Sequence, residues 1–291
     1  LAVTSLFSAI YLILAQYLRT PVLMRGENCD LAMPDGSVFR RWLKRYYVAW
    51  IFRRCTAFLA IGTENKNYYM DRGIEDSRIF FTPYAVDNER FKIKAEAGRP
   101  SGDTLRSEFG LELKQKVILF SGKFIPRKCP DIIIKALNII DWQNQKMPAL
   151  IFVGEGEMEQ KLRTLAPDAI FLGFKNQSEL PPIYNLADVI VLPSEFEPWG
   201  LVINEAMASG TAVIVSDQVG CAKDLLNDKC GRVFPHGNVE ALADALVQCL
   251  EDSDKMGAAA GNTIVKWGFR EDIIGLKQAI KYAESCHDDS S

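Results

Sequence analysis

Short runs of apolar and β-branched residues alternate with helix-favouring segments from residue 111 to residue 267. The runs are too short for buried helices and therefore predict strands; they lie at 116–122, 149–156, 170–173, 189–192 and 211–215. Segments that favour helix lie between them, at 131–140, 179–186 and 200–209. This alternation predicts an α/β domain with a parallel, doubly wound sheet, which binds ligands at the carboxyl ends of its strands.

The first part of the chain shows the same alternation in fewer units. An apolar helix-like run at 5–18 precedes a strand at 21–27, and one long helix is expected from Gly36 to Ile61, running into the next strand. The polar stretch 96–104 contains Gly and Pro and predicts a linker. We therefore predict a partial N-terminal domain at 1–96, a linker at 97–110, a second domain at 111–267 and a C-terminal helix at 268–285.

The chain enters its first helix directly from Leu1, with no strand–helix unit before it. We therefore expect that the N-terminal part of a longer protein is missing. The apolar run is shorter than the ~20 residues that span a bilayer. No basic segment precedes it, as one would in a signal peptide.

Composition is that of an ordinary globular protein, with 48% hydrophobic and 24% charged residues and a net charge of −3. This charge gives no reason to expect nucleic acid as a partner. The seven cysteines form no CxxC pair and no zinc spacing, which is typical of reduced thiols in a cytoplasmic protein. With two histidines in the chain, a histidine-based metal site is nearly excluded. We expect neither a metal nor an organic cofactor.

The clearest chemistry lies in the segment 189–216. Glu197 falls in the loop before a helix that opens at Gly200, and Glu205 lies on that helix. The N–H groups at a helix start attract an anion such as a diphosphate, and carboxylates accept hydrogen bonds from sugar hydroxyls. On a continuous helix the two acids would be about 12 Å apart along the axis. This layout matches a nucleotide-sugar, with ribose, diphosphate and hexose in a row.

Both acids also have a purely structural interpretation. Glu197 can complete a capping box with Ser194. Glu205 can be an ordinary surface acid near the positive end of the helix. The surrounding residues favour the functional interpretation.

The stretch PSEFEPWGLVINEAMASGTAVI resembles the signature of retaining glycosyltransferases of the group 1 family (glycogen synthase/mannosyltransferase-like). The resemblance implies the GT-B fold, in which two Rossmann-like doubly wound domains face a cleft, the N-terminal one being incomplete here. It implies that Glu197 contacts the donor sugar and Glu205 the ribose, with Trp199, Gly200 and Leu201 as donor-binding neighbours. It also implies that the C-terminal helix returns to the first domain.

The loop SGKFIPRKCPD carries Lys123 and Lys128, two cations that can both reach a diphosphate. It resembles the family element in which two cations neutralise the leaving nucleoside diphosphate without a metal. Such charge-assisted contacts are strong, most of all in a water-poor cleft. Lys123 stands where the family usually has Arg, so bidentate geometry is lost, and Cys129 replaces a common Gly. The alternative, a solvated basic loop, accounts better for Arg127 than for the two lysines.

Three further positions near strand ends are candidate donor contacts: Gly122, Gly156 and Phe174. Gly156 belongs to a Gly-x-Gly turn, but Glu159 stands where a dinucleotide fingerprint needs Gly or Ala, so a dehydrogenase is a poor interpretation. By resemblance, Gly156 allows close approach in the wall of the donor cleft. The segment ending at Phe174 resembles the one that recognises the nucleobase, and simple packing is an equal alternative for that ring.

In the first domain, Arg25 and Glu27 end a predicted strand and are candidate acceptor contacts at its carboxyl edge. The stretch 40–54 is basic and aromatic, and no acid occurs between Asp35 and Glu64. One interpretation is a peripheral contact with anionic lipid. The other, which we favour slightly, is a solvated helix face whose aromatic residues pack on the sheet.

The resemblance implies a metal-independent hexosyltransferase. It would move a hexose from a UDP- or GDP-sugar to a hydroxyl of a glycan or a lipid-linked acceptor, with retention of configuration. Two other functions would use the same nucleotide site: a GT-B nucleotide-sugar epimerase and an inactive fragment that binds nucleotide-sugars. A cytoplasmic protein is expected, with membrane association if the stretch 40–54 contacts lipid.

Overall fold

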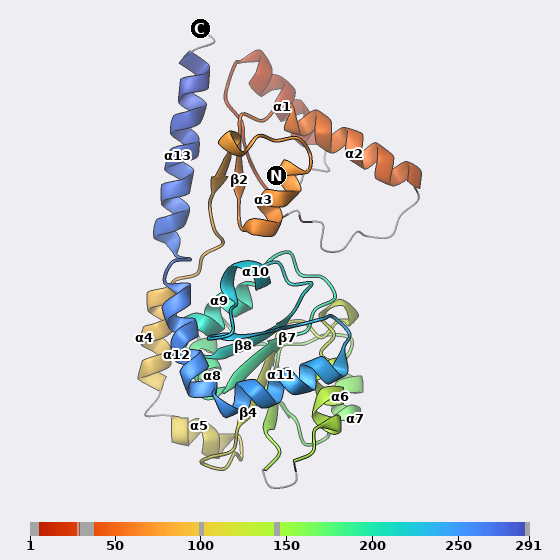
Figure 1. Cartoon of the computed structure of the whole chain (residues 1–291), viewed down its shortest axis with the longest axis vertical. Helices are drawn as coiled ribbons and strands as arrows, with labels where there is room; N and C mark the ends of the chain where they lie inside the picture. Colours follow the sequence, from red (N-terminus) through yellow and green to blue (C-terminus); the bar gives the residue numbers. More distant parts are fainter. Residues whose placement is uncertain (1–5, 28, 30–37, 99–101, 143–145, 289–291) are drawn as a thin grey trace. The chain divides into compact units, whose positions relative to one another are not determined.

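The computed structural model describes residues 6–27, 29, 38–98, 102–142 and 146–288 of the chain. Contacts divide the chain into two units (Figure 1). Unit 1 comprises residues 1–84 and 269–291, and unit 2 comprises residues 85–268. Each unit contains helices and a parallel β-sheet, which confirms the predicted α/β class.

Unit 2 is built on a parallel sheet with the strand order β6-β5-β4-β7-β8-β9. Its strands are β4 (Val117–Ser121), β5 (Ala149–Val153), β6 (Ile170–Phe171), β7 (Val189–Leu192), β8 (Ala212–Ser216) and β9 (Gly231–Phe234). The chain begins at the centre with β4, moves outward to β6, and returns to the other side of β4 with β7. The order therefore reverses between β4 and β7, which is where doubly wound sheets bind their ligands.

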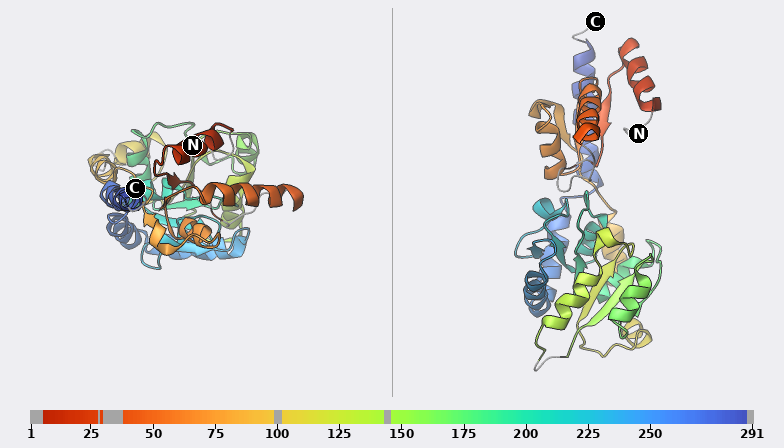
Figure 2. Two further views of the ribbon diagram at one scale, coloured as in Figure 1. Left: turned by 90° about the horizontal axis from the view of Figure 1, so that it is seen from above. Right: turned by 90° about the vertical axis from the view of Figure 1, so that its right-hand side faces the viewer.

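Helices flank the sheet of unit 2 on both sides (Figure 2). Ile118 and Phe120 of β4 point into a core shared with α6 (Asp131–Ile139) and α11 (Val239–Glu251). The neighbouring residues of β4 point to the other face. Right-handed crossovers in opposite directions place α6 and α9 (Leu201–Ala208) on opposite faces. β4, β7 and β8 are thus buried on both sides along their whole length, which explains their continuous apolar runs.

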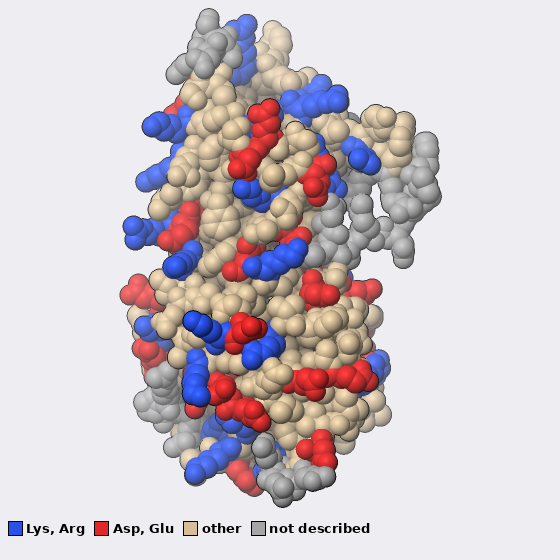
Figure 3. Space-filling model, viewed as in Figure 1, with Lys and Arg blue, Asp and Glu red and all other residues tan. Residues whose placement is uncertain are grey.

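The remaining helices of unit 2 form a further layer and the connections. α4 (Asn88–Gly98) packs on α8 (Leu180–Leu186) and on α9, and α12 (Ser253–Ile264) packs on α9 and β8. The other described helices of the unit are α5 (Gly102–Glu108), α7 (Glu159–Leu165) and α10 (Ala222–Leu225). Acidic and basic side chains are mixed over the face that Figure 3 shows.

The division between the units differs from the predicted one. Residues predicted to end the first domain and to form the linker belong to unit 2, because the first segment of unit 1 ends at Tyr84. Phe91 and Ala95 of α4 are buried, and α4 packs on α8, which α5 also contacts. The boundary at 96 and the linker at 97–110 were therefore wrong. The described residues on either side of 99–101, up to Gly98 and from Gly102, lie in helices α4 and α5 of the same unit.

Unit 1 has a smaller parallel sheet, of order β1-β2-β3, formed by Leu23–Arg25, Ala57–Ala60 and Ile79–Phe81. Helices α2 (Val38–Phe52) and α3 (Thr63–Met70) contribute to an aromatic cluster in which Phe52, Phe58 and Tyr69 pack within 5.0–5.5 Å of one another. The long helix predicted to reach Ile61 ends at Phe52, because the chain turns there to begin β2.

The C-terminal helix α13 (Phe269–Asp288) belongs to unit 1 and packs on β2 and β3. Ala279 is buried against Ala57 and Leu59. One turn before it, a Cβ atom on Gly275 would overlap the Phe81 carbonyl, coming within 2.7 Å of its carbon. The helix can therefore lie directly on β3 because glycine stands at the crossing.

We expect Gly275→Ala to lower the free energy of unfolding by roughly 1–3 kcal/mol, the usual cost of forcing an extra group into a packed contact. The measurement is urea unfolding followed by circular dichroism. Gly261→Ala is the matched control, because its Cβ would meet its nearest atom, the Met207 carbonyl oxygen, at 3.7 Å. That change should be neutral or stabilise by up to about 1 kcal/mol. Equal midpoints for the two variants would contradict the close crossing.

Candidate functional site

The candidate site lies at the carboxyl edge of the unit 2 sheet, beside the neighbouring strands β4 and β7. The chain leaves β4 and β7 toward opposite sides of the sheet. The loops that follow these strands are joined through their main chains. The Glu195 N–H donates to the Arg127 carbonyl at 2.9 Å, and the Arg127 guanidinium donates to the Phe196 carbonyl at 3.0 Å. The two loops are therefore held side by side at the switch point of the sheet.

Lys128 and Glu197 are two predicted catalytic residues that the structure brings together. The Lys128 ammonium donates to the Glu197 carboxylate, and their side chains are 17% and 15% exposed. Because the pair is largely shielded, water and salt screen it less than an exposed pair. An ammonium has three donors, so Lys128 can meet an anion while it holds Glu197.

The capping-box interpretation of Glu197 is wrong. The N-cap of α9 is Gly200, and no side chain caps it. Gly200 has φ +97° and ψ +59°, a left-handed conformation. A Cβ there would come within 2.9 Å of the Leu192 side chain. Glycine is thus required to start the helix at this point.

The start of α9 offers donors to an anion. The Ile203 N–H donates to the Gly200 carbonyl, whereas the first N–H groups of a helix, here those of Leu201 and Val202, have no helical acceptor. They carry the positive end of the helix dipole. The predicted donor-binding positions Gly200 and Leu201 therefore lie where a diphosphate would be bound by main-chain groups.

Lys123, the other predicted cation, is exposed on the loop after β4. Among the residues that the structure describes, it has no ion-pair partner. Gly122 opens this loop with φ +155°, and its N–H donates to the Val153 carbonyl at 2.9 Å. Phe124 anchors the loop in the core. The structure thus leaves the Lys123 ammonium accessible, and its contact with a phosphate stays a prediction.

Glu205 is not an ordinary surface acid. Its two carboxylate oxygens accept hydrogen bonds from the Tyr184 hydroxyl at 2.8 Å and from the Gln177 amide at 3.2 Å. Tyr184 is buried on α8, and the side chain of Ser121 at the end of β4 also hydrogen-bonds its hydroxyl. These contacts fix the orientation of the Glu205 carboxylate near the end of β4. Each oxygen retains a second lone pair for a ligand hydroxyl.

Burial dominates the protonation of this cluster. It raises the pKa of Glu205, and the hydrogen bonds from Tyr184 and Gln177 oppose the shift. Burial and the neighbouring Glu205 carboxylate raise the pKa of Tyr184 well above its usual value. The tyrosine therefore stays protonated and acts as the donor in this pair.

Phe174 follows β6 and is 68% exposed. The packing interpretation of this ring is therefore wrong. Its N–H donates to the Glu155 carboxylate at 3.4 Å, and Gly173 before it has φ +66°. An exposed aromatic ring at the carboxyl edge of the sheet is accessible for stacking against a flat ligand such as a nucleobase.

Two further predicted donor contacts have a structural role; Gly156 is exposed and stays a predicted donor contact, whereas the Trp199 side chain is buried. A Cβ on Gly156 would come within 2.8 Å of the Phe124 main chain, so the glycine allows two loops of the protein to close on each other. Trp199 is 3% exposed, its indole N–H donates to the Asn204 amide oxygen at 2.9 Å, and its ring lies 5.2 Å from Trp267. The prediction that Trp199 contacts the donor was therefore wrong for its side chain.

The candidate acceptor contacts lie at and just beyond the end of β1 in unit 1. Arg25 pairs with Asp272 of α13 at 3.2 Å and donates to the Thr82 carbonyl at 3.4 Å. Glu27 accepts a hydrogen bond from Tyr84, whose pKa is raised by burial first and by Glu27 second. Arg25 and Glu27 are both exposed. Their role toward an acceptor stays a prediction.

The sequence pattern missed Tyr184 and Gln177 as partners of Glu205, and Arg127 as the residue that joins the two loops. Arg127 had been interpreted as a solvated side chain. A weak signal existed for Tyr184, because a tyrosine inside a buried helix needs a partner for its hydroxyl. No local pattern identifies that partner.

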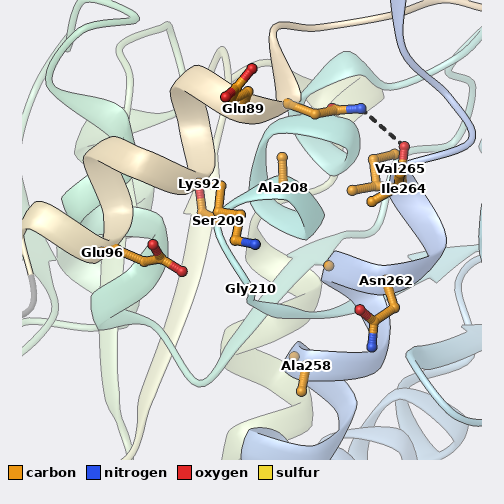
Figure 4. A pocket seen from close by; sticks show the side chains of 13 residues that line it. Glu89, Lys92, Glu96, Ala208, Ser209, Gly210, Ala258, Asn262, Ile264 and Val265 are labelled. Carbon is orange, nitrogen blue, oxygen red and sulfur yellow. Dashed lines mark hydrogen bonds between the residues drawn. The ribbon is translucent and has the colours of Figure 1, made fainter.

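A separate hollow of about 390 Å³ lies at the other end of α9 (Figure 4). It is lined by Lys92 and Glu96 of α4, by Ser209 and Gly210 after α9, and by Asn262 of α12. Because α9 separates it from the Gly200 end, this hollow is not part of the candidate site. Within the described part of the chain, no group of three His, Cys, Asp or Glu residues could hold a metal ion.

Comparison with known sequences assigns the family. Residues 102–265 match the family described as "Glycosyl transferases group 1". An uncharacterized glycosyltransferase of Methanocaldococcus jannaschii is 33% identical over 177 residues, 58% of this chain and 41% of that protein. The GDP-mannose-dependent alpha-(1-6)-phosphatidylinositol monomannoside mannosyltransferase of Mycobacterium tuberculosis is 31% identical over 214 residues, 68% of this chain and 54% of that one. The chain spans about half the length of these relatives.

Solved structures agree on the fold. Sucrose-phosphate synthase from Thermosynechococcus elongatus has a TM-score of 0.73 at 19% identity, covering 94% of this chain and 72% of its own. Anabaena HepE in complex with UDP has a TM-score of 0.71 at 20% identity, covering 96% and 74%. These are GT-B proteins, so the predicted fold class is confirmed. Because the family match covers more than half of its residues, this chain belongs to the group 1 family of glycosyl transferases.

Proposed function

We propose that the chain carries the donor site of a retaining hexosyltransferase that uses a UDP- or GDP-sugar. The observation that carries this proposal is the shielded contact between Lys128 and Glu197 beside the start of α9. A cation for phosphate and a carboxylate for sugar hydroxyls meet there, as the junction between diphosphate and hexose requires. One relative is named as GDP-mannose-dependent, and a fold neighbour was solved with UDP-glucose, which supports both donor classes.

Each residue has a distinct role in this proposal. Lys128, Lys123 and the free N–H groups of α9 neutralise the charge that develops on the leaving diphosphate. Glu197 accepts hydrogen bonds from the hexose, and Glu205 accepts them from the ribose. Phe174 stacks on the base. Lys128, Glu197 and Glu205 are held by contacts within the protein before the donor arrives, so these three groups need little reorganisation during the reaction.

The state of the two carboxylates bears on the route by which retention would be achieved. Glu197 is engaged by Lys128 and Glu205 by Tyr184, so neither is poised as a free nucleophile. We therefore favour attack of the acceptor hydroxyl on the same face that the phosphate leaves, with a phosphate oxygen taking the proton. No step in this route requires a metal. The acceptor is a glycan or lipid-linked hydroxyl, and a sequence with seven cysteines but no CxxC pair supports a cytoplasmic setting.

The proposed activity is tested with a panel of UDP- and GDP-sugars, read as released nucleotide and, by NMR, as the anomeric configuration of the product. We expect one donor class to be turned over with retention. Glu197→Gln keeps the size of the side chain and removes its charge, so we expect the rate to fall by roughly 10²-fold, as for loss of one preorganised contact. An epimerised nucleotide-sugar without transfer would instead indicate the epimerase.

Nucleotide binding is a separate prediction, measured by titration calorimetry with UDP and GDP. Lys128→Ala and Glu205→Ala should each weaken binding by about 1–3 kcal/mol, the cost of losing a charge-assisted hydrogen bond. Lys116→Ala is the control, because Lys116 pairs with Asp188 at 2.8 Å just before β4, at the amino edge of the sheet. Unchanged nucleotide affinity in both site variants would contradict the placement of the donor site at the carboxyl edge of the unit 2 sheet.

Donor affinity should also depend on pH through Glu205. Because the pKa of Glu205 is raised, the carboxylate takes up a proton at a higher pH than an ordinary Glu and then loses acceptor capacity toward ribose. Affinity for a UDP- or GDP-sugar should therefore fall as the pH is lowered toward the raised pKa. Glu205→Gln should bind more weakly at neutral pH and lose this component of the pH dependence. Parallel pH curves for both proteins would exclude Glu205 as the titrating group.

A further inference from the structure

The segments by which the chain enters and leaves unit 2 are tied together by one side chain. The chain enters the unit after Tyr84 and leaves it after Gly268. The Asn88 amide, at the start of α4, donates to the Ile264 carbonyl at 3.0 Å and to the Trp267 carbonyl at 3.3 Å (dashed line at Ile264 in Figure 4). These three residues, Asn88, Ile264 and Trp267, are here called the joint.

Asn88 is itself held firmly in place on α4. The Asp87 carboxylate accepts a hydrogen bond from the Arg90 N–H at 3.0 Å and so caps the helix. One turn on, Phe91 is 2% exposed, and its ring lies 6.3 Å from the ring of Tyr184 on α8. The two amide hydrogens of Asn88 match the two carbonyls that it meets. An aspartate of the same shape would place an oxygen against them instead.

On the other side of the joint, Trp267 contacts the loop that leads into the candidate site. Its ring lies 5.2 Å from the ring of Trp199, at an angle of 32°. Trp199 directly precedes Gly200, where α9 starts. The main chain of Trp199 is held separately, because its carbonyl accepts a hydrogen bond from the Cys221 N–H at 3.1 Å. Trp267 therefore packs on the side chain that anchors this loop.

The start of α9 depends on this anchor. A side-chain cap commonly fixes the first turn of a helix, but no side chain caps α9 at Gly200. Trp199 is the buried residue of the segment 195–199. A ring that only filled space would add to the overall stability of the unit. A ring that packs on the anchor of a loop also orders that loop.

We propose that Asn88 and Trp267 are positioning residues of the candidate donor site. Asn88 holds the chain end after α12, Trp267 then packs on Trp199, and this contact fixes residues 195–200 and the first N–H groups of α9. Neither side chain needs to touch a donor. Both connections to unit 1 leave from the joint, so the order of the loop is tied to them. That the loop binds a nucleotide-sugar rests on the proposed function, whereas its dependence on the joint does not.

The first test is hydrogen exchange of the 291-residue chain without nucleotide, read by mass spectrometry of peptides. Trp267→Leu and Asn88→Asp should each speed the exchange of amides 195–204, for Trp267→Leu by about 2- to 12-fold, the worth of one aromatic pair. Trp267→Phe keeps a ring and should restore most of the protection. Asn88→Asp removes no ring, so it tests the joint even if Trp267→Leu does not fold.

Two matched controls lie elsewhere in unit 2. Trp142→Leu removes a half-buried indole whose N–H donates to the Leu137 carbonyl of α6 at 3.2 Å. Asn262→Asp makes the same change as Asn88→Asp at an exposed position of α12. Both should leave the exchange of 195–204 unchanged, whatever they do to the urea midpoint. Equal exchange of this segment in the joint variants and the controls would overturn the proposal.

The route from Asn88 through Trp267 is tested with the double variant. Once the indole is gone, the place of the chain end no longer matters to the loop. The double variant Asn88→Asp with Trp267→Leu should therefore exchange residues 195–204 no faster than Trp267→Leu alone. Effects that multiply would contradict the assignment of Asn88 as acting through Trp267.

Titration of the same proteins with UDP and GDP keeps the two proposals apart. We expect both joint variants to weaken nucleotide binding, Trp267→Leu by about 2- to 12-fold, and both controls to bind as the unchanged chain does. Faster loop exchange in a chain that binds no nucleotide would support the joint and defeat the donor site. Nucleotide binding that Lys128→Ala weakens and neither joint variant changes would support the donor site and overturn the positioning role.

Discussion

The contact between Lys128 and Glu197 depends on main-chain pairing between loops, and the rest of the candidate site is arranged around it. Lys128 ends a single 3-10 turn, and Glu197 lies in a loop, so no long helix or strand positions either residue. The loop of Glu197 is instead held from two sides, by the hydrogen bond from Glu195 to Arg127 and by a bridge to Val219 after β8. The two side chains meet because their main chains are fixed at the point where β4 and β7 diverge.

Glu205, at the same edge of the sheet, is a largely buried carboxyl group that two hydrogen-bond donors contact. Burial disfavours the ionised carboxylate, and the hydrogen bonds from Tyr184 and Gln177 favour it; the raised pKa means that burial prevails. In the proposed donor complex, ribose hydroxyls would donate more strongly to the ionised carboxylate than to its protonated form. Donor binding and deprotonation of Glu205 would then be linked, and each would promote the other.

Local features of unit 2 could be predicted from the sequence, and features that depend on strand order could not. Apolar runs predicted five of the six strands of the unit 2 sheet. The sixth strand, β9, was not predicted because it is short and contains Arg232 and the exposed Val233. The helix start at Gly200 between two acids was also local. The contact from Lys128 to Glu197 spans 69 residues of sequence, and only the three-dimensional order of strands brings it about. Periodicity likewise does not tell whether a ring such as Trp199 faces a crevice or the core.

One packing rule applies to the sheets of both units. In unit 2, β4, β7 and β8 are covered on both faces, and α4 adds cover to α8 and α9. In unit 1, α13 covers one face of a three-stranded sheet, and α2 and α3 contribute to the other. Among the side chains of α1 (Leu6–Tyr17) whose burial the structure describes, Leu12 is the buried one. β2 therefore follows the packing rule of unit 2, with Ala57 and Leu59 toward α13 and Phe58 and Ala60 toward the opposite face.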